Sequence, residues 1–355
     1  MMKLIKITLI SILSLAVLSL IGLIVYTIIK DYRPDKEVSL DIENNQSKIL
    51  KREDVISGIT FNIGYGGLDE GRDFFMDGGK MSRSESKEKT QYNLEKMIET
   101  LSDKKVDFIF LQEIDIDSSR SFHINQVDYY RNEMKGYGST FGKNYDVPWV
   151  PVPFTRPMGK ALSGIMTFSK YKIDKAIRYS LPGEYNFLVQ LFQLDRCIVE
   201  NRILVEDGKE LVLINVHLSA YDKEGVIREE QSMFLKSFVE KEYEKGNYVV
   251  VGGDWNQLMP NVDNNKLNPK RLNYMPDWLV PLSQNFNPKG FKWAVDIQTP
   301  TVRSIDKPYK KGENFVTVID GFLVSNNLEI LETKGIDLDF KYSDHNPVYV
   351  KLKLK

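Results

Sequence analysis

The chain has 355 residues, and its 48 Lys and Arg against 49 Asp and Glu leave a formal net charge of −1. That balance argues against a non-specific nucleic-acid binder, which would normally carry a basic surface. The single cysteine, Cys197, excludes an internal disulfide, so a hydrophobic core must supply the stability, and the length allows one large sheet core or two smaller domains.

An uncharged apolar run occupies residues 7–29, after Lys3 and Lys6. At about 1.5 Å per residue, a helix of this length spans the hydrocarbon layer of a membrane, which is roughly 30 Å thick. A polar, charged stretch follows at residues 30–52. We therefore predict a short tail at 1–6, a transmembrane anchor at 7–29 and a stalk at 30–52.

A cleaved signal peptide is the alternative for residues 7–29. Its apolar region would be shorter, about 7–15 residues, and would end in small residues at a cleavage site. This run ends in Ile-Val-Tyr-Thr-Ile-Ile-Lys, which suits cleavage poorly and favours an uncleaved anchor. The short N-terminal tail favours retention inside the cell. We expect a single-pass protein of the cell membrane with its large domain outside the cytoplasm.

Strands and helices alternate along the rest of the chain. Strand patterns lie at 55–62, 106–111, 163–168, 195–202, 210–217, 248–251, 316–324 and 347–354. Helical spacing of apolar residues lies at 85–102, 123–134 and 224–244. This order predicts an α/β domain at 53–355 with mixed strand connections. The strands at 316–324 and 347–354 are expected to lie side by side.

The predicted strand at 248–251 runs directly into the sequence GGDWN. Its two glycines allow a tight backbone turn and leave room for a bulky neighbour. Asp254 and Asn256 would lie on the same side of an extended segment. A carboxylate and an amide placed in this way can hold a water, a metal or a phosphate oxygen. The alternative is an Asp- and Asn-rich turn that closes a hairpin.

Polar side chains recur where the predicted strands end. They are Asn62, Glu113, Asn215, His217, Asp254, Asn256, Asp320, Asp344 and His345. Taken singly, each has a plain structural explanation, such as a hydrogen-bonded turn, a solvated strand end or a core histidine. Two of the three histidines fall in this set together with carboxylates and amides. Their joint occurrence at successive strand ends indicates a functional site.

Four short motifs in this order resemble the endonuclease/exonuclease/phosphatase superfamily, which includes DNase I-like nucleases, neutral sphingomyelinases and inositol-polyphosphate phosphatases. They are Leu111-Gln112-Glu113, Asn215-Val216-His217-Leu218-Ser219, Gly252-Gly253-Asp254-Trp255-Asn256 and Ser343-Asp344-His345-Asn346-Pro347, with Asn62 before them and Asp320 between the last two. The resemblance covers residues 53–355. It implies a four-layer α/β sandwich, in which two mixed β-sheets face each other, helices lie outside, and the active site lies at the sheet edge.

The resemblance also implies metal-dependent hydrolysis of phosphoesters. Glu113, with Asn62 and Asp344, would hold Mg²⁺, or alternatively Mn²⁺. Asp254 would orient and deprotonate the attacking water, and Asn256 would fix that geometry.

The remaining site residues would bind the phosphate. His345, paired with Asp320, would donate to a phosphate oxygen. His217 would contact the phosphate from the other side or assist the leaving group, and abasic-site endonucleases generally lack this histidine. Asn215 would bind the substrate. Arg120 either clamps a phosphate or forms a structural salt bridge.

Two regions are expected to choose the substrate: the proline- and aromatic-rich stretch at 147–156 and the long irregular stretch at 257–316. Their aromatic side chains could stack on bases, rest on lipid or pack the loops on themselves.

Three functions remain open. The first is an outward-facing, membrane-anchored, Mg²⁺-dependent phosphoesterase that acts, as a monomer, on a lipid head group or a small phosphoester. The second is a nuclease with the same mechanism, and the third is an inactive domain that only binds. The slight excess of acidic over basic residues and the anchor favour the first. Retention of Glu113, Asp254 and His345 argues against the third.

Overall fold

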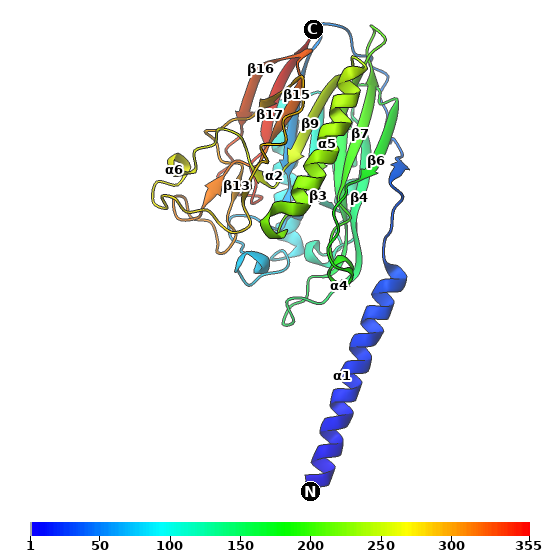
Figure 1. Ribbon diagram of the computed structural model, residues 1–355, viewed down its shortest axis with the longest axis vertical. Helices are drawn as coiled ribbons and strands as arrows, with labels where there is room; N and C mark the ends of the chain where they lie inside the picture. Colours follow the sequence, from blue (N-terminus) through cyan, green and yellow to red (C-terminus); the bar gives the residue numbers. More distant parts are fainter. Residues whose placement is uncertain (1) are drawn as a thin grey trace.

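The structure is a computed structural model that describes residues 2–355. Helix α1 (Met2–Lys30) extends away from the rest of the molecule (Figure 1). By length and composition it could cross a membrane, because its most apolar window has a mean hydropathy of 2.7 and is not buried. The helix covers the predicted anchor and also residues 2–6 of the predicted tail, whereas Met1 lies outside the described residues.

Two β-sheets form the centre of the domain. The seven-stranded sheet has the order β1 (Glu37–Ser39), β6 (Lys175–Ser180), β7 (Cys197–Leu204), β8 (Glu210–His217), β9 (Tyr248–Asp254), β15 (Asp320–Ser325) and β12 (Phe291–Ala294). The six-stranded sheet has the order β16 (Leu328–Gly335), β17 (Val348–Leu354), β2 (Val55–Asn62), β3 (Phe108–Asp115), β5 (Gly159–Ser169) and β4 (Gly138–Val150). Both mix parallel and antiparallel pairs.

The two sheets pack face to face, with helices outside them. Phe110 of β3 and Phe322 of β15 belong to the core between the sheets. Helices α2 (Lys87–Lys104) and α3 (Gln126–Glu133) cover the outer face of the six-stranded sheet, and α5 (Val226–Glu244) covers that of the seven-stranded sheet. These four layers confirm the predicted α/β sandwich.

Short elements complete the fold. They are α4 (Phe187–Gln190), α6 (Asn264–Leu267), β10 (Gln257–Leu258), β11 (Val280–Pro281), β13 (Val302–Arg303), β14 (Val316–Thr317) and the 3₁₀ turns η1 (Gly64–Gly66), η2 (Phe75–Asp77), η3 (Ser119–Ser121) and η4 (Lys223–Gly225).

Several strands differ from the prediction. Strands β4, β6, β12 and β16 were not predicted, because polar residues interrupt their apolar pattern, as in LEILETKG of β16. The predicted strand at 316–324 is divided into β14 and β15. Strand β15 pairs with β9, in the seven-stranded sheet, whereas β17 pairs with β2 in the six-stranded sheet. The expectation that the strands at 316–324 and 347–354 lie side by side is therefore wrong.

The two glycines of GGDWN lie inside β9 rather than in a turn after it. A Cβ on Gly253 would lie 1.9 Å from the carbonyl oxygen of Val216, and one on Gly252 would lie 2.4 Å from the Phe322 ring. The glycines are thus required by close packing against β8 and β15, and not by a turn. This packing allows β9 to lie close to its neighbours at the site.

Replacing Gly253 with Ala is expected to destabilise the protein by more than about 3 kcal/mol, because the backbone of Val216 cannot yield to the new methyl group. Gly71→Ala is the matched control, since its Cβ would meet only the Asp69 carboxylate at 3.2 Å. Urea unfolding of both variants measures the difference. Equal stabilities would contradict the packing explanation.

The predicted stalk at 30–52 is not a free connector. Residues 37–39 form β1 at the edge of the seven-stranded sheet. Asn45 Nδ2 donates to the carbonyl oxygen of Ile173 at 2.7 Å, and Leu50 is fully buried in the core between the sheets. Polar composition suggested a linker, but paired backbone and one apolar residue join this segment to the domain.

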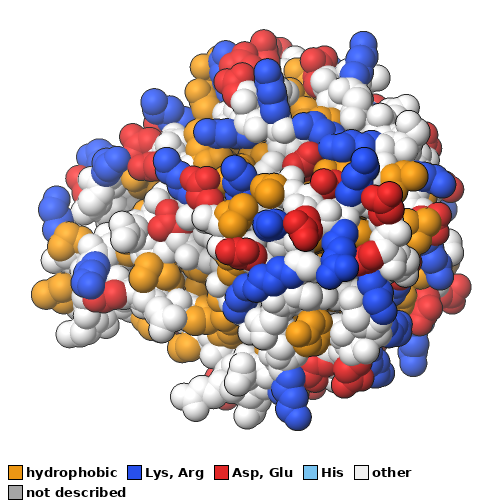
Figure 2. Space-filling view, turned by 90° about the horizontal axis from the view of Figure 1, so that it is seen from above, with side chains coloured by type: hydrophobic (Ala, Val, Ile, Leu, Met, Phe, Trp, Pro, Cys, Tyr) orange, Lys and Arg blue, Asp and Glu red, His pale blue; other side chains and the backbone are white. Residues whose placement is uncertain are grey.

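At the end of the domain opposite α1, Lys and Arg side chains lie among Asp and Glu (Figure 2).

Candidate active site

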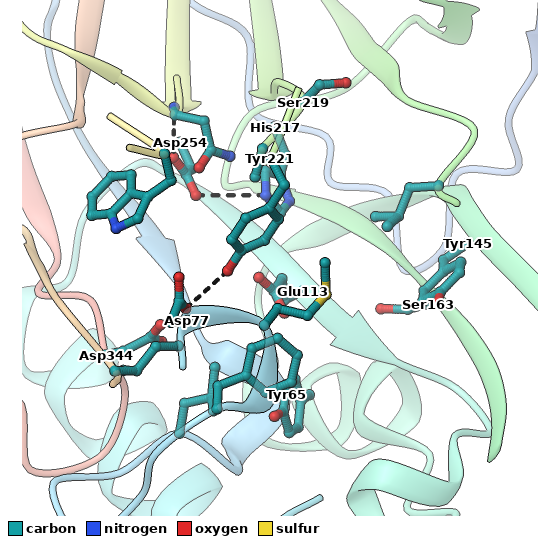
Figure 3. A pocket seen from close by; sticks show the side chains of 18 of the residues that line it. Tyr65, Asp77, Glu113, Tyr145, Ser163, His217, Ser219, Tyr221, Asp254 and Asp344 are labelled. Carbon is teal, nitrogen blue, oxygen red and sulfur yellow. Dashed lines mark hydrogen bonds and ion pairs between the residues drawn. The ribbon is translucent and has the colours of Figure 1, made fainter. Parts of the chain in front are cut away.

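Three side chains of the predicted site come from neighbouring strands of the seven-stranded sheet. His217 at the end of β8 is in register with Asp254 at the end of β9, and Asp254 is in register with Asp320 at the start of β15. His217 Nε2 lies 3.5 Å from Asp254 Oδ2 (Figure 3). The register thus places one imidazole and two carboxylates in a row, at the ends of three neighbouring strands.

Asn62 approaches this row from the six-stranded sheet. It ends β2 and is in register with Gln112 of β3, the residue before Glu113. The Asn62 Nδ2 donates to Asp254 Oδ2 at 3.0 Å and to Glu113 Oε1 at 3.3 Å. Its Oδ1 accepts from the backbone N–H of Gly64 at 3.0 Å. Asn62 therefore joins the two sheets at the site and orients two carboxylates.

Glu113 lies inside β3 rather than after its end, as the strand continues to Asp115. The pairing of β3 with β5 shifts between Leu111 and Ile114, and Glu113 has a φ of 54°. Positive φ is uncommon for a residue other than glycine, and a bulge of this kind re-aims a side chain. Here the irregular backbone presents the Glu113 carboxylate to a cavity.

Arg120 makes the salt bridge that was one of its two predicted roles. Its Nη2 lies 2.9 Å from Asp115 Oδ1, and its Nη1 lies 3.4 Å from Glu113 Oε2. The guanidinium also lies 4.0 Å from the centre of the Tyr65 ring. With both carboxylates engaged, Arg120 holds Glu113 in position and has little capacity left for a phosphate.

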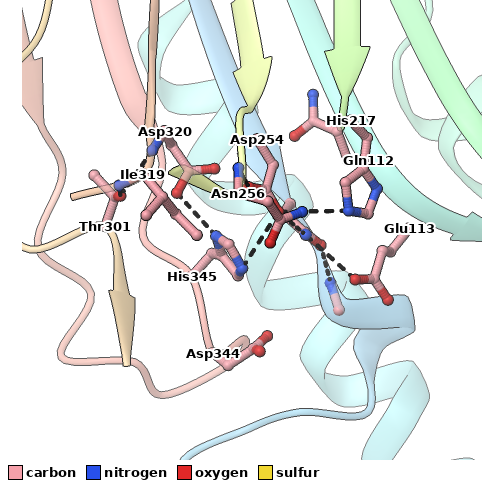
Figure 4. Close-up of polar contacts among 12 residues, drawn as sticks. Gln112, Glu113, His217, Asp254, Asn256, Thr301, Ile319, Asp320, Asp344 and His345 are labelled. Atoms are coloured by element: carbon pink, nitrogen blue, oxygen red, sulfur yellow. Dashed lines mark hydrogen bonds and ion pairs between the residues drawn. The ribbon is translucent and has the colours of Figure 1, made fainter. Parts of the chain in front are cut away.

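His345 comes from the six-stranded sheet, where it lies in the chain just before β17, and its side chain reaches the row of His217, Asp254 and Asp320. Its Nδ1 lies 2.9 Å from Asp320 Oδ2, and its Nε2 lies 3.7 Å from Asp254 Oδ2 (Figure 4). The predicted Asp320–His345 pair is present, although it forms between the two sheets and not between adjacent strands. The result is a chain of carboxylate, imidazole and carboxylate across the sandwich.

Thr301, which sequence reasoning missed, positions this chain. Its Oγ1 accepts from the backbone N–H groups of Ile319 and Asp320 at 3.0 and 3.1 Å. The next residue, Val302, forms an isolated bridge with His345. Part of the irregular stretch at 257–316 therefore serves as a support for the site. No sequence signal marks a threonine that acts through the backbone.

The two histidines differ in charge. Burial lowers the pKa of His345, but the carboxylates of Asp320 and Asp254 outweigh it and raise the pKa to about 10. Burial, with the Arg196 and His345 cations, holds the pKa of His217 well below the ordinary 6.5. At neutral pH, His345 is a cation and His217 is neutral. Burial also raises the pKa of Asp254, to about 7, against the effect of His345.

Asn256 does not continue an extended segment, because its φ is 51°. Its backbone N–H donates to Asp254 Oδ1 at 2.9 Å, and its Nδ2 donates to the carbonyl oxygen of Leu218 at 2.9 Å. Arg228 of α5 donates to the Asn256 carbonyl oxygen. The backbone of Asn256, more than its side chain, orients the Asp254 carboxylate.

Asn215 does not reach the cavity. It is fully buried, and its Nδ2 donates to the carbonyl oxygens of Leu111 at 3.2 Å and Met166 at 2.9 Å. Its Oδ1 accepts from Gln112 Nε2 at 2.8 Å. These hydrogen bonds occupy the amide and contradict the predicted substrate contact. Asn215 lies on the same face of β8 as His217, but two residues further from the end of the strand and deeper between the sheets.

A cavity of about 260 Å³ lies above the row of site residues. Polar groups lie at its base, whereas much of its wall is apolar, with Phe74, Val150, Met158, Phe192 and Leu194 among the lining residues. The Tyr221 hydroxyl donates to Asp77 Oδ2 at 2.9 Å, and both residues line the cavity (Figure 3). The cavity can hold a phosphate together with an apolar substituent.

The two regions expected to choose the substrate have mixed roles. Phe286 and Trp293 pack on Trp255, so these aromatics stabilise the loop itself. Trp278 lines the cavity. In the stretch at 147–156, Val150 is buried at the end of β4, whereas Phe154 is 88% exposed.

Arg196 is a second residue that sequence reasoning missed. It precedes β7, lines the cavity, and donates through Nη1 to the carbonyl oxygen of His217 at 3.3 Å. Unlike Arg120, it forms no carboxylate ion pair with any of the residues described by the structure. A partly buried guanidinium next to His217 is well suited to bind a phosphate. The residue pair Asp195-Arg196 at the start of a strand gave no distinctive signal.

Glu113 and Asp344 form a suitable ligand set for a divalent cation. Both line the cavity. Burial and the charge of Glu113 raise the pKa of Asp344, against the effect of His345. Two carboxylates that repel each other are stabilised by a cation between them, and oxygen ligands suit Mg²⁺ or Mn²⁺. Asn62, predicted as a third ligand, already makes hydrogen bonds through both Nδ2 and Oδ1.

A second cluster could be considered for a metal. Ligand atoms of Asp254, Asp320 and His345 lie within 4.8 Å of one another. However, a protonated imidazole has no lone pair for a metal, and its positive charge already interacts with both carboxylates. This cluster is better described as an ion-paired acid, and the Glu113–Asp344 pair fits a cation better.

Comparisons with solved structures agree with this fold. An endonuclease/exonuclease/phosphatase from Beutenbergia cavernae DSM 12333 gives a TM-score of 0.57 at 15% identity, over 85% of this chain and 72% of that one. ANGEL2, a 2′,3′-cyclic phosphatase, gives 0.54 at 14%, over 89% and 99%. TDP2 from D. rerio with a single-strand DNA product gives 0.53 at 16%, over 84% and 99%. At these identities, the similarity concerns the fold alone.

No curated protein matches this sequence. A family model does match: the Endonuclease/Exonuclease/phosphatase family aligns with residues 59–345. The matched range runs from β2 to His345. It contains the row of side chains at the strand ends and the carboxylate–imidazole–carboxylate contacts described above. The protein therefore belongs to the endonuclease/exonuclease/phosphatase family.

Proposed function

We propose that the protein is a membrane-anchored, metal-dependent phosphoester hydrolase whose domain faces away from the cytoplasm, and that it acts on a lipid head group or a small phosphoester. Members of its family are hydrolytic phosphoesterases and nucleases. The observation that carries the proposal is that His345 and Asp254, two members of the Asp320–His345–Asp254 chain, line one cavity together with Glu113 and Asp344. Helix α1 would serve as the anchor.

The proposed reaction adds water to phosphorus and breaks one P–O ester bond. Asp254 accepts a proton from the attacking water, whose oxygen forms the new P–O bond. The His345 cation donates to a phosphate oxygen as negative charge grows there. The leaving oxygen takes up a proton from solvent water and departs as an alcohol, and Asp254 returns its proton to the solvent. Neutral His217 has one N–H with which it contacts the phosphate or the leaving oxygen.

A divalent cation held by Glu113 and Asp344 would neutralise the phosphate and polarise its P–O bonds. Glu113→Gln keeps the shape of this side chain and removes its charge. We expect it to lower turnover about a hundredfold and to raise the required Mg²⁺ concentration about 10–100-fold. Titration of activity with Mg²⁺ after chelation measures both effects. Glu133→Gln removes an exposed carboxylate and serves as the matched control.

Full activity in excess chelator would refute the metal requirement. An unchanged Mg²⁺ titration in Glu113→Gln would leave the requirement intact but would place the cation elsewhere.

Arg196→Met should raise KM for a phosphodiester at least about tenfold, with a smaller change in kcat, because a phosphate contact made before the transition state is lost. Arg196→Lys keeps the charge but loses the two-pronged geometry, so it should recover only part of the affinity. Arg131→Met on α3 is the control. A loss confined to kcat would argue for a structural role of Arg196.

A nuclease is the second candidate, because D. rerio TDP2, with the same fold, was solved with single-strand DNA. Assays of the full chain on sphingomyelin, lysophospholipid, inositol phosphates and duplex DNA, with and without Mg²⁺, distinguish the two. Hydrolysis of DNA alone would favour the nuclease. Absence of hydrolysis with every substrate would favour a binding domain.

A further inference from the structure

We propose that the active site opens onto the membrane that α1 enters, and that its substrate is a phosphoester lipid within that membrane. The inference rests on the proposed function, including α1 as an anchor, and it assigns the substrate class that the proposed function leaves open.

The chain enters the domain at the same end of the seven-stranded sheet, measured along the strands, as the active site. Glu37 of β1 pairs with Tyr179 of β6, and the last residue of β6 pairs with the first residue of β7. The start of β7 pairs with the end of β8, which carries His217 beside Asp254. In Figure 1, α1 departs from this end of the domain, away from the C-terminus. Anchor and site therefore share one end of the molecule.

The connection between α1 and β1 is short and held in place. Residues 31–36 span at most about 20 Å when fully extended. The Nζ of Lys143 lies 3.7 Å from the centre of the Tyr32 ring, and the backbone N–H of Ser180 donates to the carbonyl oxygen of Lys36 at 2.8 Å. The end of the sheet that carries the active site is consequently kept close to the point where α1 would leave the membrane.

Exposed apolar side chains lie in three segments that also contribute residues to the cavity or flank residues that do: η2, the tip of the β4–β5 hairpin and α4. We call them the apolar rim: Met76, Trp149, Val152, Phe154, Phe187 and Leu188. Their exposed fractions include 88% for Phe154, 54% for Phe187 and 56% for Leu188. Large apolar side chains exposed together indicate an interaction surface, and aromatic and leucine side chains suit the lipid interface.

The tip of the β4–β5 hairpin projects beyond the sheet at this end. The last residue pair between β3 and β5 is Asp115 with Ser163, whereas β4 and β5 stay paired as far as Val150 and Gly159. Phe154 lies in the loop that follows. The projection carries the most exposed side chain of the rim away from the domain, towards the side from which α1 departs.

The rim continues into the cavity. Met76 and Val152 belong to the rim and also line the cavity, and Phe192 and Leu194, just after α4, line its wall. The carboxylates and histidines lie at its base. A lipid phosphoester matches this arrangement, because its phosphate would meet the base while its apolar part stays beside the wall and the rim.

Positive charge lies next to the hairpin tip. The Nε of Arg83 donates to the carbonyl oxygen of Pro157 at 2.8 Å, and burial, followed by the neighbouring Arg156, lowers the pKa of Arg83. In the described part of the chain, neither arginine forms an ion pair with a carboxylate. Anionic head groups would complement this pair.

Site-specific labelling tests contact with lipid without relying on activity. Cys197 is buried, so Phe154→Cys would introduce the one readily labelled thiol. The full chain, labelled there with an environment-sensitive fluorophore, is reconstituted in phosphatidylcholine/phosphatidylglycerol vesicles containing brominated lipid. We expect quenching at position 154 but not for Ile49→Cys, an exposed site near the opposite end.

Two results would overturn membrane contact at this surface. One is a label at position 154 that remains as accessible to an aqueous quencher as the label at position 49. The other is a signal that depends on protein density but not on brominated lipid, which would indicate contact with a second copy of the chain.

The substrate class is tested by comparing two substrates in the same vesicles. Phe154→Asp combined with Leu188→Asp should slow hydrolysis of the vesicle phospholipid at least about tenfold, and should change hydrolysis of soluble bis(4-nitrophenyl) phosphate less than about twofold. Ile49→Asp is the control. Equal losses on both substrates, or a lipid loss no larger than the control's, would overturn the lipid assignment.

Failure of the proposed function is distinguishable from failure of this inference. If the wild-type chain hydrolyses neither substrate, the hydrolase proposal falls and the substrate assignment falls with it, while the quenching result still decides whether the rim contacts lipid. If it hydrolyses the soluble ester but no vesicle lipid, the hydrolase stands and the lipid assignment is overturned.

Discussion

Asp254→Asn should lower kcat about a thousandfold, because it removes the proposed general base. Asp254 lies 3.5 Å from His217 and 3.7 Å from His345, and it accepts a hydrogen bond from Asn62. Asparagine keeps the size of the side chain, and its carbonyl oxygen can still accept from Asn62. Initial-rate kinetics with a soluble phosphodiester measure the loss in kcat.

The pH dependence gives this prediction a direction. A base acts when it is deprotonated, so its contribution is present above its pKa and is lost as the pH falls through it. Burial raises the pKa of Asp254 to about 7. The wild type should therefore lose activity below neutral pH, and Asp254→Asn should lose this acid limb together with most of its rate.

Asp103→Asn, an exposed change on α2, is the control for Asp254→Asn, and thermal unfolding of both variants shows that the fold is retained. A rate within about tenfold of wild type, with the acid limb unchanged, would remove Asp254 from the role of general base.

His345→Ala is the second change with a large expected effect, a loss in kcat of about a thousandfold. The cation that donates to the phosphate is lost, and the carboxylates of Asp320 and Asp254 are left facing each other. Asp320→Asn should cost no more than His345→Ala. The double variant should cost little more than His345→Ala alone, because residues that act as one unit are not additive.

The sign of the pH effect follows from the pair. Asp320 and Asp254 raise the pKa of His345 to about 10 despite its burial. The cationic form is present below that pKa and is lost as the pH rises through it. Asp320→Asn removes one anion, so the alkaline limb of kcat should move to lower pH. Fully additive losses in the double-mutant cycle, with an unmoved alkaline limb, would show that the two residues act independently.

Local patterns in the sequence were sufficient for the fold class and for most of the site. The apolar strand at 210–217 and the β-branched strand at 248–251 each end in polar residues, which the structure places in one row as His217 and Asp254. Periodic apolar spacing identified α2 and α5 within a few residues. These features arise from interactions between residues that are close in sequence, so local sequence patterns predict them.

Features that depend on distant neighbours were misjudged. Asn215 lies two residues from His217, on the same face of β8, and looks equivalent to it, yet it lies deeper between the sheets, where it accepts from Gln112 and donates to the backbone of β3 and β5. Arg120 was open to two roles, and the choice depended on Asp115 and Glu113 lying within its reach.

By itself, the sequence determined the long helices and most of the central strands, which of the strand ends are polar, and that one helix is apolar enough to cross a membrane. Only the tertiary structure decided that Asp320 and His345 meet between two sheets, that Arg196 stays without a carboxylate partner in the described part of the chain, and that the edge bearing the site is the edge where the chain enters from α1. The physical reason is range: strand and helix patterns arise from residues within a turn or two of each other, whereas sheet pairing and charge contacts join residues that are far apart along the chain and become neighbours only when the two sheets pack.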